Sequence, residues 1–335
     1  MVKPEPLKIN KLIFQLTILF LSTILIGLIS LSIGSININF LEIINVLLNN
    51  SENEQLNLII YKIRLPRVIY AIFIGGGLSI AGAVFQAILM NPLAEPYILG
   101  ISSGGTFGAV LSFLVGLSFF GTQIFAFTGA VLVMFLVFFL GKRYGDLEPN
   151  TLLLSGVMVG AFFSAAILLS IIFLNDSLRT AVYWMVGSLS FAQSENLIYI
   201  VVFTFIISFY LIIYSHKFNV ISLGDETAKS LGINANFLKK STYFTASLLI
   251  GSLVSVSGII GFVGLLVPHV CRMIWGVDNR IIVPTSFFIG AIYLTIADTI
   301  ARTVILPSEL PVGAITAIIG APVFIYLLRT RFSLN

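Results

Sequence analysis

Charged residues are scarce in this sequence of 335 residues. Asp, Glu, Lys and Arg together make up 10% of it and hydrophobic residues 58%, whereas soluble domains are roughly 25% charged. A soluble protein of this length has too small an interior for that much apolar surface, but a lipid bilayer accommodates it. No polar stretch is long enough to fold separately, so we expect residues 1–335 to form a single transmembrane domain.

Residues that usually carry catalysis or bind metals are also few. The one cysteine, Cys271, excludes an internal disulfide and a cysteine-rich metal site. The two histidines, His216 and His269, lack metal-ligand spacing, and no Gly-x-x-x-x-Gly-Lys-Ser/Thr phosphate-binding loop occurs. We therefore expect no catalytic residue, no metal site, no cofactor and no nucleic-acid partner for this chain. If ATP drives its activity, another chain must hydrolyse the ATP.

Apolar stretches close to the length needed to cross a bilayer recur along the chain. They predict an all-α fold, a polytopic helical bundle of about ten spans, the eighth of which is short enough to be a half-helix. The first span follows basic residues, as in a signal peptide, but its long apolar run without a clear cleavage site favours a retained anchor. The ten stretches are approximately residues 12–33, 68–90, 96–118, 122–140, 152–174, 197–214, 243–260, 263–275, 281–306 and 312–328.

Basic residues predict the orientation, because they concentrate in cytoplasmic loops. With a cytoplasmic N-terminus, 13 of the 18 basic residues lie inside, and an even number of spans returns the C-terminus to the cytoplasm. The five basic residues left outside are Lys62, Arg64, Arg67, Arg179 and Arg302.

A weak internal repeat accompanies these spans. A shift of 176 positions gives eight identities over the 27 positions from Ile74 to Gly100, including Gly75 with Gly251 and Gly82 with Gly258. The two copies lie five spans apart and should cross the membrane in opposite senses, as the inverted repeats of transporters do. The alternative is that both segments are simply glycine-rich packing helices.

Eight short motifs follow one another along the chain, and their order resembles the FecCD-type permeases of type II ABC importers, which carry iron siderophores, haem and cobalamin. The resemblance extends from about residue 20 to residue 330. The motifs are Arg64-Leu65-Pro66-Arg67, Gly82-Ala83-Val84-Phe85-Gln86, Asn91-Pro92-Leu93-Ala94-Glu95-Pro96, Leu223-Gly224-Asp225-Glu226, Gly261-Phe262-Val263-Gly264-Leu265, Pro268-His269, Ala297-Asp298-Thr299-Ile300-Ala301-Arg302 and Gly320-Ala321-Pro322-Val323-Phe324.

The resemblance implies a permease subunit that moves an iron-siderophore, haem or cobalamin-like substrate into the cytoplasm. It implies a location in the bacterial cytoplasmic (inner) membrane. The partners that it implies are a second permease subunit in a homodimer or heterodimer, two ATPase subunits that bind ATP, and an extracytoplasmic substrate-binding protein. An ion-coupled secondary transporter is the alternative, although its best coupling carboxylate, Asp298, lies near a span end. A membrane-embedded enzyme is a further alternative, for which no set of acid, base or metal ligands is found.

Three of the outer arginines have a role implied by the resemblance. Arg64 and Arg67 lie at the mouth of the second span, where Pro66 should limit the helix, and Arg302 ends the ninth. In such importers, permease arginines meet glutamates of the binding protein, and a bidentate pair also fixes orientation. The alternatives are contact with lipid phosphates for Arg64 and Arg67, and neutralisation of Arg302 by Asp298 one turn earlier.

The loop 222–236 is predicted to contain a short helix between breaks. Asp225 and Glu226 suit a helix N-terminus after Gly224, and Gly232 can end the helix. Ala228 and Leu231 should share one face. By resemblance this is the coupling helix that contacts the ATPase; otherwise it is a plain surface helix.

Two turns are candidates for the cytoplasmic gate. Asn91, Pro92 and Leu93 lie between the second and third spans, and Pro149 and Asn150 lie between the fourth and fifth. Backbone left unpaired by prolines at membrane depth must face protein or a water-filled cavity. The alternative is that both are ordinary tight turns.

Overall fold

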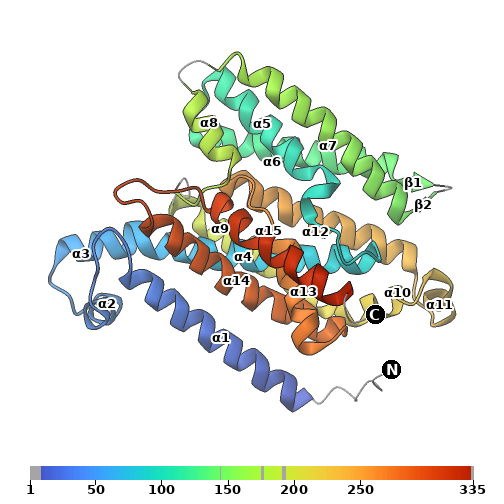
Figure 1. Cartoon of the computed structure of the whole chain (residues 1–335), viewed down its shortest axis with the longest axis horizontal. Coiled ribbons are helices and arrows are strands. Elements are labelled where there is room, and N and C mark those ends of the chain that lie inside the picture. Colours follow the sequence, from blue (N-terminus) through green and yellow to red (C-terminus); the bar gives the residue numbers. More distant parts are fainter. Residues whose placement is uncertain (1–8, 144, 175–176, 191–193, 333–335) are drawn as a thin grey trace.

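Helices make up most of the chain in the computed structural model, which describes residues 9–143, 145–174, 177–190 and 194–332 (Figure 1). Ten of them overlap the ten predicted apolar stretches. These are α1 (Ile9–Ser32), α4 (Leu65–Ile88), α5 (Ile101–Val115), α6 (Phe119–Leu140), α7 (Pro149–Ile171), α9 (Leu197–Ile213), α12 (Ala235–Ser257), α13 (Val263–Trp275), α14 (Asn279–Thr303) and α15 (Val312–Phe332).

Shorter elements connect these helices. The helical ones are α2 (Phe40–Leu47), α3 (Glu54–Leu58), α8 (Leu178–Met185), α10 (Ser215–Ile221), α11 (Asp225–Ser230), a π-helical turn (Ile59–Arg64) and two 3-10 turns (Pro96–Leu99 and Ser194–Asn196). A departure from the all-α prediction is a small antiparallel hairpin between α6 and α7, formed by β1 (Lys142–Arg143) and β2 (Asp146–Leu147).

Several helices have the length and apolarity of membrane spans. Within the described residues, five qualify, or six if the bent pair α9 and α10 is counted as one crossing. Helix α12 is long enough, with 23 residues, but its many serines make it less apolar, and α5 and α13 are apolar but short. Membrane-length apolar helices are therefore confirmed, while the count of ten crossings stays a prediction.

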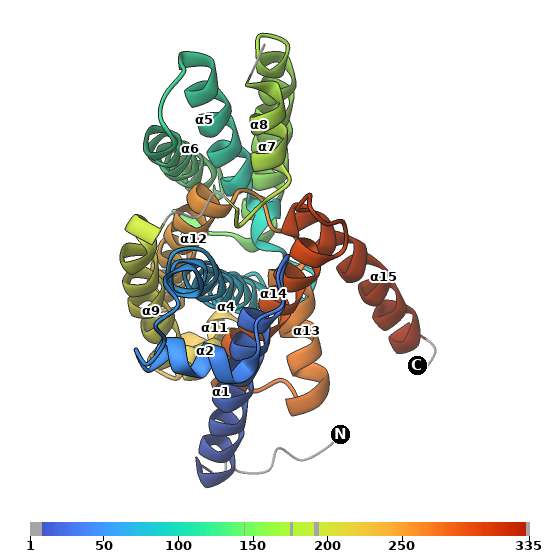
Figure 2. The same ribbon diagram turned by 90° about the vertical axis from the view of Figure 1, so that its left-hand side faces the viewer.

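Helix α4 is the centre of the bundle. Nearly all of its residues are buried, and Figure 2 shows it among α1, α9, α12 and α14. Its glycines allow this packing: a Cβ at Gly75 would lie 2.3 Å from the carbonyl oxygen of Gly290 in α14, and one at Gly82 would lie 1.9 Å from that of Gly264 in α13. Close backbone approach at small residues is how helices pack in membranes.

The expectation that Pro66 limits the helix was wrong. One continuous helical segment runs from Glu54 to Ile88 and passes through the π-helical turn just before Pro66. A proline lacks a backbone N–H and clashes with the preceding helical turn. The wider π turn accommodates it without ending the helix.

The bundle has two distinct ends (Figure 1). At the end that we call the α3 end lie α2, α3 and the segment between α14 and α15. At the opposite end, the α11 end, lie α10, α11 and the β1–β2 hairpin, together with the start of α1 and the far end of α15. The first described helix therefore starts, and the last one finishes, at the same end of the bundle.

Helices α4 and α12 pack reciprocally, because each contacts the two helices that follow the other in the sequence. Helix α4 contacts α13 and α14, while α12 contacts α5 and α6. Helix α4 runs from the α3 end towards the α11 end, and α12 starts at the α11 end and runs the other way (Figure 1). Each of these two helices is followed by a break in helical structure, at residues 89–95 and 258–262 respectively.

Candidate functional site

The beginning of α4 and the end of α14 are joined by a buried ion pair. The Nη2 atom of Arg67 lies 2.9 Å from Oδ1 of Asp298, and its Nε donates to both carboxylate oxygens, at 3.0 and 3.1 Å. The two side chains are only 8% and 1% exposed. Burying two charges is unfavourable unless several hydrogen bonds satisfy them, and the bidentate arrangement supplies these.

Asp298 also contacts a second arginine, one turn further along α14. The Nε atom of Arg302 lies 3.1 Å from Oδ2 of Asp298, and its Nη2 donates to the hydroxyl of Ser30 in α1 at 2.8 Å. The neutralisation of Arg302 by Asp298 considered from the sequence is therefore present. Through these contacts, Asp298 connects α14 to α4 directly and to α1 by way of Arg302.

Glu309 adds a second carboxylate, from the segment between α14 and α15. Its Oε2 accepts hydrogen bonds from Nη1 of Arg67 at 2.7 Å and from the hydroxyl of Ser190 at 2.6 Å. Burial alone would raise the pKa of Glu309, but the charge of Arg67 and the hydrogen bonds from Ser190 and Arg67 hold that pKa below its usual value. The side chain is 42% exposed, so this carboxylate is accessible from solvent.

Arg64 is held by backbone rather than by a carboxylate among the described ion pairs. Its Nη1 donates to the carbonyl of Leu31 at 2.6 Å and its Nη2 to the carbonyl of Ile36. Leu31 is in the last turn of α1, where unpaired carbonyls carry partial negative charge. Arg64 therefore caps the C-terminus of α1.

The structure brings together all three arginines predicted to dock a binding protein, but it buries them within the chain. Together with Asp298 and Glu309 they form a group, which we call the arginine cluster, with one unbalanced positive charge. A cavity of about 130 Å³ opens beside it and is lined by Arg64, Arg67, Arg302 and Glu309. This is well below the roughly 300–1,000 Å³ of small-molecule sites, so the cavity matches a single inserted side chain.

The first predicted gate turn follows a re-entrant path. Asn91 Oδ1 accepts a hydrogen bond from the N–H of Leu93 at 2.9 Å, which closes the turn. The chain then returns into the bundle, because a Cβ at Gly264 would lie 2.7 Å from Pro96 and 2.9 Å from the carbonyl oxygen of Leu78, near the middle of α4. The turn thus leads from the end of α4 back to its middle.

Two side chains of this re-entrant segment (residues 91–99) form hydrogen bonds with the non-helical backbone between α12 and α13, at residues 258–262. Glu95 Oε1 accepts a hydrogen bond from the N–H of Phe262 at 2.8 Å. The hydroxyl of Tyr97 donates to the carbonyl of Ile260 at 2.7 Å and accepts from its N–H at 3.1 Å. Non-helical backbone at membrane depth requires partners of this kind, so the two breaks stabilise each other.

The second predicted gate turn lies at the start of α7. Helix α7 begins at Pro149, and the N-cap residue Glu148 accepts a hydrogen bond from the N–H of Asn150 at 3.2 Å. Further along α7, a Cβ at Gly156 would lie 2.7 Å from the Cα of Leu99 in the re-entrant segment. The segment after the first predicted gate turn and the helix that starts at the second are therefore closely packed at Leu99 and Gly156.

The short helix predicted in the loop 222–236 is α11. It begins at Asp225 after Gly224 and ends before Gly232, and both glycines have left-handed backbone, with φ of 101° and 77°. A carboxylate oxygen of Asp225 lies 2.7 Å from Nζ of Lys239, a lysine whose side chain is only 3% exposed. This ion pair ties α11 to α12. Glu226 is exposed.

Ala228 and Leu231 do not share a face, which corrects the sequence prediction. Ala228 is fully buried, whereas Leu231 is 62% exposed. Helix α11 ends at Ser230, so Leu231 no longer follows the helical direction. The exposed apolar surface at this position comes from Leu231 and Leu223, on either side of α11.

Glu95 and Glu309 have structural roles that were not predicted from the sequence. Glu95 lies in the motif 91–96, where a carboxylate between two prolines in an almost uncharged region was the signal that could have indicated its role. Glu309 had no local signal, because its partners Arg67 and Ser190 are 242 and 119 positions away.

Comparisons with known proteins agree with this architecture. The sequence model of the FecCD transport family matches residues 22–330. The Fe(3+)-citrate import system permease protein YfmE of Bacillus subtilis is 38% identical over 94% of this chain and 95% of its own length. The hemin transport system permease protein HmuU of Yersinia pestis is 37% identical over 93% and 96% respectively.

A solved structure shows the same fold. It is an inward-facing conformation of an ABC transporter assigned to the metal-chelate type, with a TM-score of 0.85 and 30% identity, covering 96% of this chain and 99% of its own. The chain is therefore a multi-pass membrane permease of an ABC importer, a transport subunit and not an enzyme. It belongs to the FecCD transport family, which confirms the family resemblance seen in the sequence, and a permease of this kind works with an ATPase and a substrate-binding protein.

Proposed function

We propose that this permease carries an iron-siderophore, haem or cobalamin-like chelate into the bacterial cytoplasm. The observation that carries the proposal is the family match over residues 22–330. Relatives of nearly equal length import ferric citrate and hemin, and the matching fold is of the metal-chelate type. ATP would act on the partner ATPase and move the permease between outward- and inward-facing states.

We propose that the partner ATPases dock at α11. The exposed Leu223 and Leu231 flank this helix and present apolar surface in an otherwise polar loop. The Asp225–Lys239 ion pair connects α11 to α12. Movement of α11 would therefore be transmitted along α12 to the non-helical residues 258–262, where Glu95 accepts a hydrogen bond from Phe262. The turns at Asn91, Pro92 and Leu93, and at Pro149 and Asn150, would then open and close the cytoplasmic gate.

We propose that the arginine cluster receives an acidic side chain of the binding protein. Its unbalanced charge and its small cavity support insertion of one carboxylate. Glu309→Gln would remove a competing carboxylate and raise the positive charge, so the association rate should increase several-fold at low salt and less at high salt. An unchanged rate at both salt concentrations would exclude docking at this cluster.

The proposed topology has ten spans, two cytoplasmic termini and an inverted repeat that aligns positions 74–100, in α4 and the segment after it, with positions 250–276, in α12 and α13. The reciprocal packing and opposite directions of α4 and α12 support the repeat. Cysteines at Glu52 and Lys229, both exposed and at opposite ends, should label from opposite sides with an impermeant thiol reagent once Cys271 is replaced by alanine. Labelling from the same side would contradict the orientation.

A second permease subunit is also proposed, with a homodimer preferred. The exposed sides of α7 and α15 carry large apolar residues, including Phe162, Leu168 and Ile325, and one such surface would meet the partner. Co-expression with a candidate ATPase should yield a complex of two permeases and two ATPases by mass measurement. The ion-coupled alternative gains no support from Asp298, because Arg67 and Arg302 already neutralise it.

A further inference from the structure

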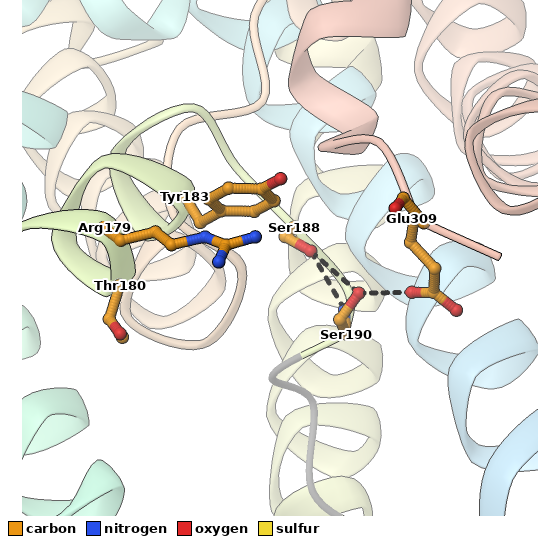
Figure 3. Close-up of a pocket in the computed structure, with 7 residues that line it drawn as sticks. Arg179, Thr180, Tyr183, Ser188, Ser190 and Glu309 are labelled. Atoms are coloured by element: carbon orange, nitrogen blue, oxygen red, sulfur yellow. Dashed lines mark hydrogen bonds between the residues drawn. The ribbon is translucent and has the colours of Figure 1, made fainter. Parts of the chain in front are cut away.

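A second, larger cavity opens at the α3 end, between α8 and the segment before α15. Its volume is about 320 Å³, at the lower limit of small-molecule sites. All seven residues that line it carry a polar or charged group, in a chain that is 58% hydrophobic. The side chains that matter here are Arg179, Thr180, Tyr183, Ser188, Ser190 and Glu309 (Figure 3).

Arg179 supplies the positive charge of this cavity. Within the described residues, no carboxylate lies within ion-pair distance of its guanidinium. The guanidinium carbon lies 5.8 Å from the ring centroid of Tyr183, a contact that helps to orient it. Figure 3 shows the group directed across the cavity towards Ser188 and Ser190.

Glu309 is the only carboxylate drawn in this lining, and its negative charge is already compensated. Its Oε2 accepts from both Arg67 and Ser190. The hydroxyl of Ser188 donates to Ser190 at 3.1 Å, so a chain of hydrogen bonds holds this wall in place. Among the described residues, the charge that faces the cavity without an ion-pair partner is therefore the guanidinium of Arg179.

We propose that this cavity is a receiving site for cargo, in which Arg179 binds a carboxylate on the rim of an anionic metal chelate. The inference rests on the proposed function and narrows its substrate class. A guanidinium binds a carboxylate with two parallel hydrogen bonds, and Thr180, which also lines the cavity, offers a hydroxyl to a neighbouring oxygen. The cavity holds a small chelate, or one edge of a larger one.

The position of the cavity fits this role. Glu309 lines both this cavity and the smaller one beside the arginine cluster. A binding protein docked at the cluster would thus release its cargo next to Arg179. The chemistry of the site favours carboxylate-bearing chelates over a net-neutral corrinoid whose rim carries mainly amides.

The test is direct binding to the permease–ATPase complex in lipid nanodiscs. The probes are ferric citrate, hemin and cyanocobalamin, which carry carboxylates on a small chelate, carboxylates on a porphyrin and no free carboxylate, respectively. Arg179→Gln should weaken binding of a carboxylate-bearing probe about tenfold or more, equivalent to losing a charge-assisted hydrogen bond. Arg179→Lys should have an intermediate effect, since lysine keeps the positive charge but lacks the planar pair of N–H donors that binds a carboxylate with two hydrogen bonds.

The matched control is Lys62→Gln, which removes an exposed charge at the same end and outside the cavity lining. A loss confined to the Arg179 variants, with cyanocobalamin unaffected, supports the proposal, and the more affected of ferric citrate and hemin identifies the source of the carboxylate. Equal losses in Lys62→Gln, or no binding of either carboxylate probe by the unmodified complex, would overturn it. ATPase activity stimulated by the binding protein is measured alongside. If this activity persists while the Arg179 variants bind the probes as the unmodified complex does, the receiving site is contradicted and the proposed function is not.

Discussion

Arg67 and Asp298 are 231 positions apart in the sequence and form a bidentate ion pair that is almost completely buried. The pair joins the start of α4, the central helix, to the end of α14. Because both charges are removed from water, each depends on the other. The same contact that neutralises Arg67 also brings it beside Arg64 and Arg302 at the cavity of the arginine cluster.

Asp298→Asn should therefore destabilise the permease strongly. Removing one partner of a buried pair costs about 3–5 kcal/mol, since the remaining charge is left uncompensated, and here both Arg67 and Arg302 lose their shared carboxylate. The measurement is thermal unfolding of the purified permease in detergent. The control is Arg280→Gln, which breaks an ion pair between a 46%-exposed arginine and a 26%-exposed Asp278 and should cost no more than about 1 kcal/mol. Equal effects of the two changes would contradict the role of the buried pair.

The Glu309–Arg67 contact should depend on pH in one direction. The pKa of Glu309 is held below its ordinary value of 4.5 in the folded chain, so its stabilising effect is complete above the unfolded pKa and is lost as pH falls through the folded pKa. The difference in Tm between the unmodified chain and Glu309→Gln should be constant from pH 5.5 to pH 8, a range that begins about one unit above the unfolded pKa. The difference should shrink as the pH falls below this range. A difference that grows on acidification would contradict the assigned charge state.

The surface around α11 can be tested with a pair of leucines. Leu231→Ser should weaken binding of the ATPase about tenfold, the loss expected for truncating an apolar anchor in an interface, while the permease stays folded. Leu41→Ser is the control, because Leu41 is 67% exposed on α2 at the opposite end. ATPase retention during purification is the measurement, and equal retention with both variants would exclude Leu231 as a contact.

Ala228 separates docking from folding. Ala228→Glu would place a charge at a fully buried position, so it should lower the yield of folded permease and not only its coupling to ATP hydrolysis. Normal thermal unfolding of this variant would contradict the burial of Ala228.

Glu95 distinguishes a structural cap from an ion-coupling group. A glutamine oxygen can still accept a hydrogen bond from the N–H of Phe262, so Glu95→Gln should preserve transport, whereas Glu95→Ala leaves that N–H unsatisfied at a break in the helix and should impair it. Uptake by the two variants is the measurement. Loss of uptake with glutamine, together with a dependence on the proton gradient, would instead favour the ion-coupled alternative.

The positions of the membrane helices followed from the sequence because a bilayer selects long apolar helices regardless of their neighbours. The helix at α11 followed for a local reason as well, since glycine can adopt the left-handed backbone that ends a helix, and Gly224 and Gly232 have this backbone at its two ends. The family resemblance added the class of transporter, which hydropathy alone does not specify.

The burial of the arginines was not predictable in this way. A topology rule treats Arg67 as an outer charge, and its partners Asp298 and Glu309 are brought to it only by the packing of α4 and α14. The same holds for Glu95, whose partner Phe262 is 167 positions away. The face assigned to Ala228 and Leu231 failed for a different reason: the helical period was applied one residue beyond the end of α11.

The most direct test of the account is uptake of a labelled chelate by proteoliposomes that contain the permease, its ATPase and its binding protein. Labelled ferric citrate, hemin and cyanocobalamin are supplied outside, with ATP sealed inside. We expect accumulation of at least one of them that requires both ATP and the binding protein and that continues when the proton gradient is collapsed by an ionophore. Accumulation that needs no ATP and stops with the ionophore would contradict the assignment of this chain as the permease of an ATP-driven chelate importer.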